Sequence, residues 1–120
     1  MEEMKLGMVE ARFADIIWQN EPVSTKELVV LCEKELKWKR TTTYTVLKKL
    51  CARGIFIMEN STVTSLISKE EFYAIQSEKF VDDTFQGSLP AFIAAFATRK
   101  KPTAEELREI RRMIDSLGEG

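Results

Sequence analysis

The segment at residues 38–54 constrains the fold most, because its side chains divide into one apolar and one polar side of a helix. Its apolar side follows the i, i+3, i+4, i+7 spacing of a single helical face, with Thr43, Val46, Leu47 and Leu50. Gly54 suits the position just beyond a helix, where the backbone turns left-handed. The spacing therefore predicts a helix that packs on a core and ends before Gly54.

The opposite side of this helix carries hydroxyl groups and cations and no carboxylate. Its residues are Arg40, Thr41, Thr42, Tyr44, Thr45, Lys48 and Lys49. Between Leu36 and Met58 the only charged residues are basic, namely Lys37, Lys39, Arg40, Lys48, Lys49 and Arg53. Such a face suits the major groove of DNA, where cations meet phosphates or guanine and Thr meets bases or the thymine methyl. The pattern equally fits a helix whose basic side is only solvated, because basic runs alone are weak evidence.

Position along the helix separates the residues expected to read bases from those expected to hold phosphates. Base contacts are predicted for residues one and two turns apart on one face, namely Thr41, Thr42, Thr45 and Lys48. Phosphate contacts are predicted for cations nearer the edges and at the ends, namely Arg40, Lys49, Lys37 and Arg53. Tyr44 fits either group.

Two helices are predicted before this segment and two strands after it. The first helix is predicted over residues 6–20, and its core-facing residues are expected to be Val9, Phe13, Ile16 and Ile17. Ser24 begins the second with a capping box that ends at Glu27. Residues 55–58 and 63–67 are short apolar or β-branched runs separated by turn residues. The predicted fold class is therefore mainly α with a small β-hairpin, and residues 1–68 are predicted to form a winged helix-turn-helix domain.

Residues 69–120 predict three more helices, which begin at caps formed by Ser68, Ser88 and Thr103. Five of the seven phenylalanines lie in this segment, which is too small to bury them alone. We therefore expect a C-terminal three-helix dimerisation domain, held by Phe72, Phe80, Phe85, Phe92, Phe96, Ile110 and Ile114. The alternative is that these helices fold back on the winged helix of the same chain.

Composition limits the chemistry that the chain can support. A net charge of −1 excludes a general polyanion binder, so nucleic-acid affinity has to come from the local basic face. Two cysteines, Cys32 and Cys51, at core-like positions and no histidine predict buried thiols, no metal site and no cofactor. Neither a nucleophile–base pair nor a phosphate-binding loop is visible in the sequence, so we do not expect an enzyme. Without a signal peptide or long apolar run, the chain is expected in the cytoplasm.

Several of these residues together resemble the penicillinase-repressor family of winged-helix transcriptional regulators. The resemblance covers nearly the whole chain and rests on motifs in five of the predicted helices. These motifs are Leu6-Gly7 with Glu10 and Trp18, Val23-Ser24 with Glu27-Leu28, Trp38 with Thr42, Thr45, Leu47, Leu50 and Gly54, and Phe96 with Glu105-Glu106-Leu107.

The resemblance implies a homodimeric bacterial repressor that binds a palindromic double-stranded DNA operator. It also implies recognition-helix contacts at Thr41, Thr42, Thr45 and Lys48, and a sensor or protease that releases the repressor. Family members carry a longer, basic wing, whereas here residues 60–67 hold no cation. The family's antibiotic-responsive members are cleaved before a phenylalanine that follows asparagine, and the matching pair here is Ala95-Phe96. A protein-interaction module that uses the winged helix without DNA is the alternative function.

Overall fold

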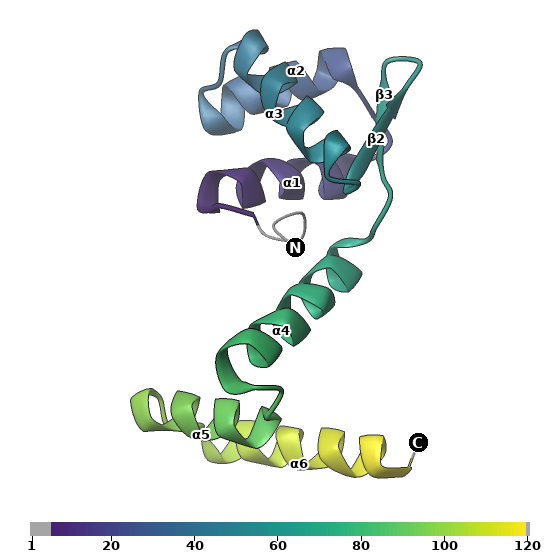
Figure 1. Cartoon of the computed structure of the whole chain (residues 1–120). Coiled ribbons are helices and arrows are strands. Elements are labelled where there is room, and N and C mark those ends of the chain that lie inside the picture. Colours follow the sequence, from purple (N-terminus) through teal and green to yellow (C-terminus); the bar gives the residue numbers. More distant parts are fainter. Residues whose placement is uncertain (1–5, 120) are drawn as a thin grey trace. The chain divides into compact units, whose positions relative to one another are not determined.

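The computed structural model describes residues 6–119, and the chain divides into two compact units between Ser77 and Glu78. The first unit contains α1 (Met8–Asn20), β1 (Val23–Ser24), α2 (Thr25–Leu36), α3 (Arg40–Ala52), β2 (Phe56–Glu59), β3 (Thr62–Ser65) and the start of α4 (Lys69–Phe85) (Figure 1). The second contains the rest of α4, α5 (Leu89–Arg99) and α6 (Ala104–Glu119). Within residues 6–119, no helix combines the length and apolar content needed to cross a bilayer.

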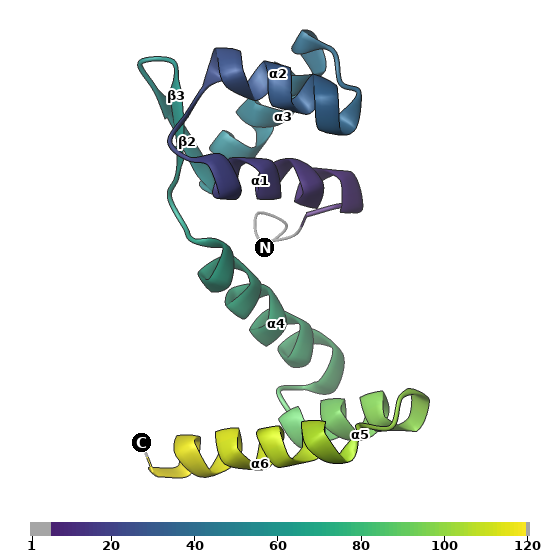
Figure 2. The same ribbon diagram turned by 180° about the vertical axis from the view of Figure 1, so that it is seen from behind.

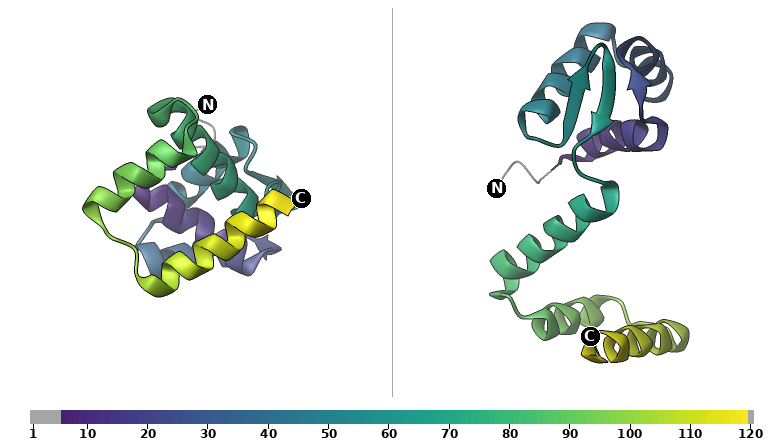
Figure 3. Two further views of the ribbon diagram at one scale, coloured as in Figure 1. Left: turned by 90° about the horizontal axis from the view of Figure 1, so that it is seen from below. Right: turned by 90° about the vertical axis from the view of Figure 1, so that its right-hand side faces the viewer.

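The first unit is a winged helix, as predicted. Helices α1, α2 and α3 pack together, and the β2–β3 hairpin follows α3 (Figure 2). The sequence predicts only this hairpin, but β1 pairs antiparallel with β3 and completes a sheet in the order β1-β3-β2 (Figure 3, right). Asn60 and Ser61 form the hairpin turn, and both have positive φ, 52° and 60°, as the tightest hairpin turns require.

The predicted caps are confirmed at the helix N-termini. Hydroxyl oxygens accept backbone N–H groups three residues ahead at 3.0 Å for Ser24 and at 3.1 Å for Ser68, Ser88 and Thr103. At α6 the box is reciprocal, because the Glu106 carboxylate accepts the Thr103 N–H at 2.9 Å. Each cap satisfies a backbone donor that the first helical turn leaves unpaired.

The core of the first unit comes from all of its elements and lies between the three helices and the sheet. Its side chains are at most 1% exposed, and they are Phe13, Ala14, Ile17, Val23, Leu28, Cys32, Leu47, Leu50, Ile55, Phe56, Val63 and Phe72. Val9 is instead 48% exposed, so the prediction that it turns inward is wrong. Ala14 takes part in the buried stripe of α1 with Phe13 and Ile17.

Phe72 also departs from its predicted place among the dimerisation residues. Its ring lies 5.7 Å from that of Trp18 and is fully buried in the first unit, together with the Tyr73 ring at its edge. The predicted domain boundary at residues 68 and 69 coincides with the N-cap of α4. The compact units divide later because the first turns of α4 belong to the winged-helix core.

The second unit has little interior of its own. No side chain of α5 is buried, and the α6 side chains described are all exposed. Phe80, Phe85 and Phe92 pack edge to face, with ring centres 5.7–6.0 Å apart. Helices α5 and α6 run in roughly opposite directions on either side of their connecting turn (Figure 3, left). Apolar residues of both helices therefore remain at the surface.

A Schellman motif ends α3 and begins the wing. The Gly54 N–H donates to the Cys51 carbonyl at 3.0 Å and the Ile55 N–H to the Leu50 carbonyl at 3.2 Å. Gly54 has φ 81°, as its predicted role requires, and a Cβ added there would meet no heavy atom within 4 Å. The backbone angle is therefore the only feature that demands glycine.

We expect Gly54→Ala to destabilise the first unit by about 1–2 kcal/mol, the cost of placing an L side chain in the left-handed region. Gly54→Asn is the matched control and should lose less, because Asn tolerates this conformation better. Urea unfolding at fixed protein concentration, followed by the fluorescence of Trp18 and Trp38, measures both changes. Equal losses for the two variants, or no loss for alanine, would contradict the role assigned to the backbone angle.

Candidate nucleic-acid interface

Helix α3 presents its polar side to solvent because its other side is locked into the core. Thr43, Leu47 and Leu50 are at most 1% exposed. The predicted contact residues on the opposite side are exposed, namely Arg40, Thr41, Thr42, Thr45, Lys48 and Lys49. We call these six residues the α3 front. They form a convex row of hydroxyls and cations on a helix that can enter a major groove.

Two local contacts organise this surface. The Arg40 guanidinium lies 5.6 Å from the centre of the Tyr44 ring, which is half-buried, so the ring supports the cation at one edge of α3. The Thr45 hydroxyl donates to the Thr41 carbonyl at 2.8 Å. Its hydrogen is therefore used within the helix, and the oxygen can act only as an acceptor while the methyl group is available for apolar contact.

The first turn of α3 adds backbone donors to these side chains. Lys39 occupies the N-cap position and makes no side-chain capping hydrogen bond. The Thr43 N–H donates to the Lys39 carbonyl at 3.1 Å, as the first regular bond of the helix. The preceding N–H groups remain without a side-chain cap, in the arrangement by which helix N-termini accept phosphate.

A carboxylate of α1 lies against the other edge of α3, a contact that the sequence did not predict. Glu10 of α1 accepts from the Lys49 ammonium at 2.7 Å and lies 3.6 Å from the Arg53 guanidinium. It also accepts the Gly7 N–H at 3.2 Å. The hydrogen bond from Lys49 is the largest of the effects that hold the pKa of Glu10 below its usual value. Lys49 and Arg53, both predicted to bind phosphate, therefore already contact an anion.

A sequence signal for this position exists. Glu10 precedes Phe13, Ala14 and Ile17 by three, four and seven residues, so it continues the buried stripe of α1 toward its N-terminus. A charged residue at the end of such a stripe lies where the helix meets its neighbour. Periodicity in α1 could thus have indicated a carboxylate beside α3, although not which cations it meets.

The wing offers apolar and acidic groups rather than cations. Residues 55–68 contain no Lys or Arg, Glu59 is exposed at the end of β2, and Met58 and Leu66 are 39% and 58% exposed. The Glu21 carboxylate accepts the Ser65 N–H at 2.7 Å and the Ser65 hydroxyl at 2.9 Å, which holds β3 beside the end of α1. The basic charge near α3 therefore comes from the helix and its flanks.

Neither cysteine has the character of a ligand or nucleophile. Burial raises the pKa of the Cys32 thiol to about 11 and also raises that of Cys51, so both thiols stay protonated at neutral pH. Across the described part of the chain, no group of three or more His, Cys, Asp or Glu side chains could hold a metal ion.

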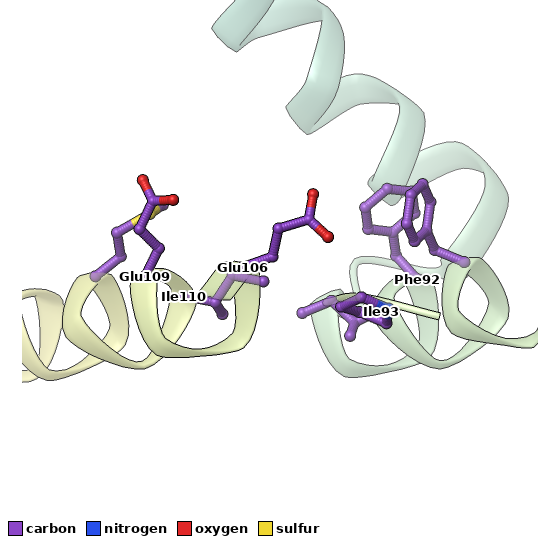
Figure 4. Close-up of a pocket in the computed structure, with 8 residues that line it drawn as sticks. Phe92, Ile93, Glu106, Glu109 and Ile110 are labelled. Carbon is purple, nitrogen blue, oxygen red and sulfur yellow. The ribbon is translucent and has the colours of Figure 1, made fainter. Parts of the chain in front are cut away.

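The second unit carries a separate apolar surface on α5 and α6. Eight large apolar side chains of these two helices, and Phe80 of α4, are 37–78% exposed; the eight are Leu89, Ile93, Phe96, Leu107, Ile110, Met113, Ile114 and Leu117. Between α5 and α6 lies a pocket of about 380 Å³, with Phe92 and Ile93 on one wall and Ile110 on the other (Figure 4). Of the predicted dimerisation residues, Phe80, Phe85, Phe92, Phe96, Ile110 and Ile114 are brought together in this unit.

Comparison with known proteins gives one consistent family. The family model described as penicillinase repressor matches residues 6–116. The penicillinase repressor of Bacillus licheniformis is 20% identical over 92% of this chain and 90% of its own length. The penicillinase repressor of Staphylococcus aureus is 23% identical over 97% and 95%, and the methicillin resistance regulatory protein MecI of Staphylococcus aureus strain Mu50 is 17% identical over 92% and 94%.

Proposed function

This chain belongs to the penicillinase repressor family, and from that membership we propose that it represses transcription as a homodimer on operator DNA. The family consists of transcriptional regulators and not of enzymes, and its model covers both compact units of the chain. The observation that carries the proposal is the α3 front, a row of exposed hydroxyls and cations opposite a fully buried apolar face.

Helix α3 is the recognition helix in this proposal. Thr41, Thr42, Thr45 and Lys48 face base edges in the major groove, while Arg40 and the uncapped first turn hold the DNA backbone. Lys49 and Arg53 lie at the edge nearest Glu10 and reach toward a flanking phosphate. Tyr44 supports Arg40 through its ring. The wing contributes shape rather than positive charge, since it holds no cation.

The second unit supplies the dimer. Its exposed apolar side chains form one stripe along α6, at Leu107, Ile110, Ile114 and Leu117, and continue onto α5 at Ile93 and Phe96. A second copy covers this surface, as apolar patches of such extent in small units require. A two-fold dimer presents two α3 helices to two half-sites and so matches a palindromic operator.

A protein-interaction module without DNA is the second candidate, and the wing favours it. Met58 and Leu66 are exposed there, cations are missing, and the net charge of the chain is −1. A salt-dependent mobility shift separates the two functions, because phosphate contacts make DNA binding fall steeply with salt. Duplexes from the promoter of the chain's own gene, and duplexes selected from random sequence, serve as probes.

We expect Thr45→Ala to weaken operator binding by about 1–3 kcal/mol and to leave a scrambled duplex nearly unaffected, because the lost contact is to a base. Thr45→Val retains the methyl group and replaces the hydroxyl by a second methyl, so it shows whether the hydroxyl or the methyl group reads the base. Arg40→Ala is the matched comparison and should weaken both duplexes alike, with a salt slope lower by about 1 per protomer. If Thr45→Ala weakens both duplexes equally, or neither, α3 does not read sequence.

We expect Ile114→Glu to convert the dimer into monomers at micromolar concentration. Ile114 is 55% exposed in the single chain, so a carboxylate there can reach solvent in a monomer but would be buried unpaired in a dimer. That burial costs about 3 kcal/mol or more, which raises the dissociation constant by about 100-fold or more. Ser116→Glu adds the same charge beside the stripe and should remain dimeric. Sedimentation velocity measures both variants, and a monomeric wild-type chain would refute the dimer itself.

A further inference from the structure

We propose that Glu10 competes with DNA phosphate for Lys49 and Arg53 and thereby lowers the sequence-independent part of the affinity for DNA. This inference rests on the proposed function, since it concerns how strongly the α3 surface binds duplexes. It assigns a regulating role to a residue of α1 that contacts no base and lies outside the α3 front. The chemical basis is that a carboxylate and a phosphate bind the same ammonium and guanidinium groups.

The geometry gives Glu10 the place that a phosphate would take at this edge of α3. One carboxylate oxygen lies 2.7 Å from the Lys49 ammonium and the other 3.6 Å from the Arg53 guanidinium. The N–H of Gly7, the N-cap residue of α1, donates to the same carboxylate at 3.2 Å. An anion is thus already bound between two cations and a helix N-terminus, which is a recurrent arrangement for phosphate.

The three side chains remain accessible enough for exchange. Lys49 is 51% exposed, Arg53 22% and Glu10 20%. A phosphate can therefore approach Lys49 directly, and binding there trades one ion pair for another instead of creating a new one. A surface ion pair of this kind contributes little to folding stability, so its main effect is on the charge that DNA meets.

The Glu10 carboxylate, which competes with phosphate, remains charged in the folded protein at neutral pH. The hydrogen bond from Lys49, that from Gly7 and the nearby Arg53 charge lower the pKa of Glu10 below the usual carboxylate range. The wing adds no cation of its own to this surface. Lys49 in the last turn of α3 and Arg53 at its C-cap both form ion pairs with Glu10.

The test is Glu10→Gln in the full chain. Gln can still accept the Gly7 N–H, so the α1 cap is kept while the charge is lost. The variant should bind a scrambled duplex more tightly than the wild type at low salt, with a steeper dependence on salt for scrambled and operator duplexes alike. One freed cation per protomer steepens the slope of a dimer by about 2, an extra loss of about tenfold between about 50 and 200 mM salt.

Asp15→Asn is the matched control. Asp15 also lies on α1, and its carboxylate pairs with the Lys69 ammonium at 2.6 Å. Its substitution by Asn changes the net charge of the chain by the same amount as Glu10→Gln. Its salt slope should equal that of the wild type. In the double variant Glu10→Gln with Lys49→Met, the steeper slope should return toward the wild-type value, because the freed cation is removed again.

The outcomes separate the proposal from its alternatives. An unchanged slope for Glu10→Gln overturns it, as does weaker DNA binding accompanied by a lower melting temperature, since Glu10 would then only fasten α1 to α3. A slope that steepens equally in Asp15→Asn also overturns it, because net charge alone would account for the change. If the wild type binds no duplex at any salt concentration, the proposed DNA-binding function fails first and this inference falls with it.

Discussion

Burial of Leu47 and Leu50 is the constraint on which the surface of the first unit depends. Once two residues of a helix are buried in a core, the orientation of the helix about its own axis is fixed. Leu47 and Leu50 are at most 1% exposed. Thr41, Thr45 and Lys48 must then face away from the core. A rotation by one residue would bury Lys48 in place of Leu47, and an unpaired buried ammonium is too costly for that alternative to compete.

Trp18 gives the wing and the start of α4 their common support. Its ring lies 5.4 Å from Phe56 on β2 and 5.7 Å from Phe72 on α4, while its Nε1 donates to the Ile67 carbonyl at 3.1 Å. A single side chain of α1 thereby contacts the strand that leaves α3 and the segment that leads into α4. Tilted aromatic pairs of this kind add a preference of orientation to simple burial.

Local signals in the sequence predicted most of the fold, and contacts between distant residues account for the rest. Ser24 and Gly54 act on neighbours three to five residues away, so their roles were readable from sequence. Phe72 lies in the same Phe-rich segment as the later phenylalanines, yet its ring packs on Trp18, and no local pattern in the sequence indicates this partner. Glu10 meets Lys49 for the same reason, through the crossing of two helices rather than through spacing within one. The front of α3 was therefore predictable, whereas its charge balance was not.

That charge balance matters more here than in a strongly basic chain. With a net charge of −1 and a wing without cations, any long-range attraction of DNA would be weak and would come from the few cations near α3. One carboxylate that contacts two of them changes a large part of the local field, whereas a basic wing would dilute its effect. In a two-fold dimer every such contact occurs twice. The strength of DNA binding would then depend as much on a residue of α1 as on the side chains of α3.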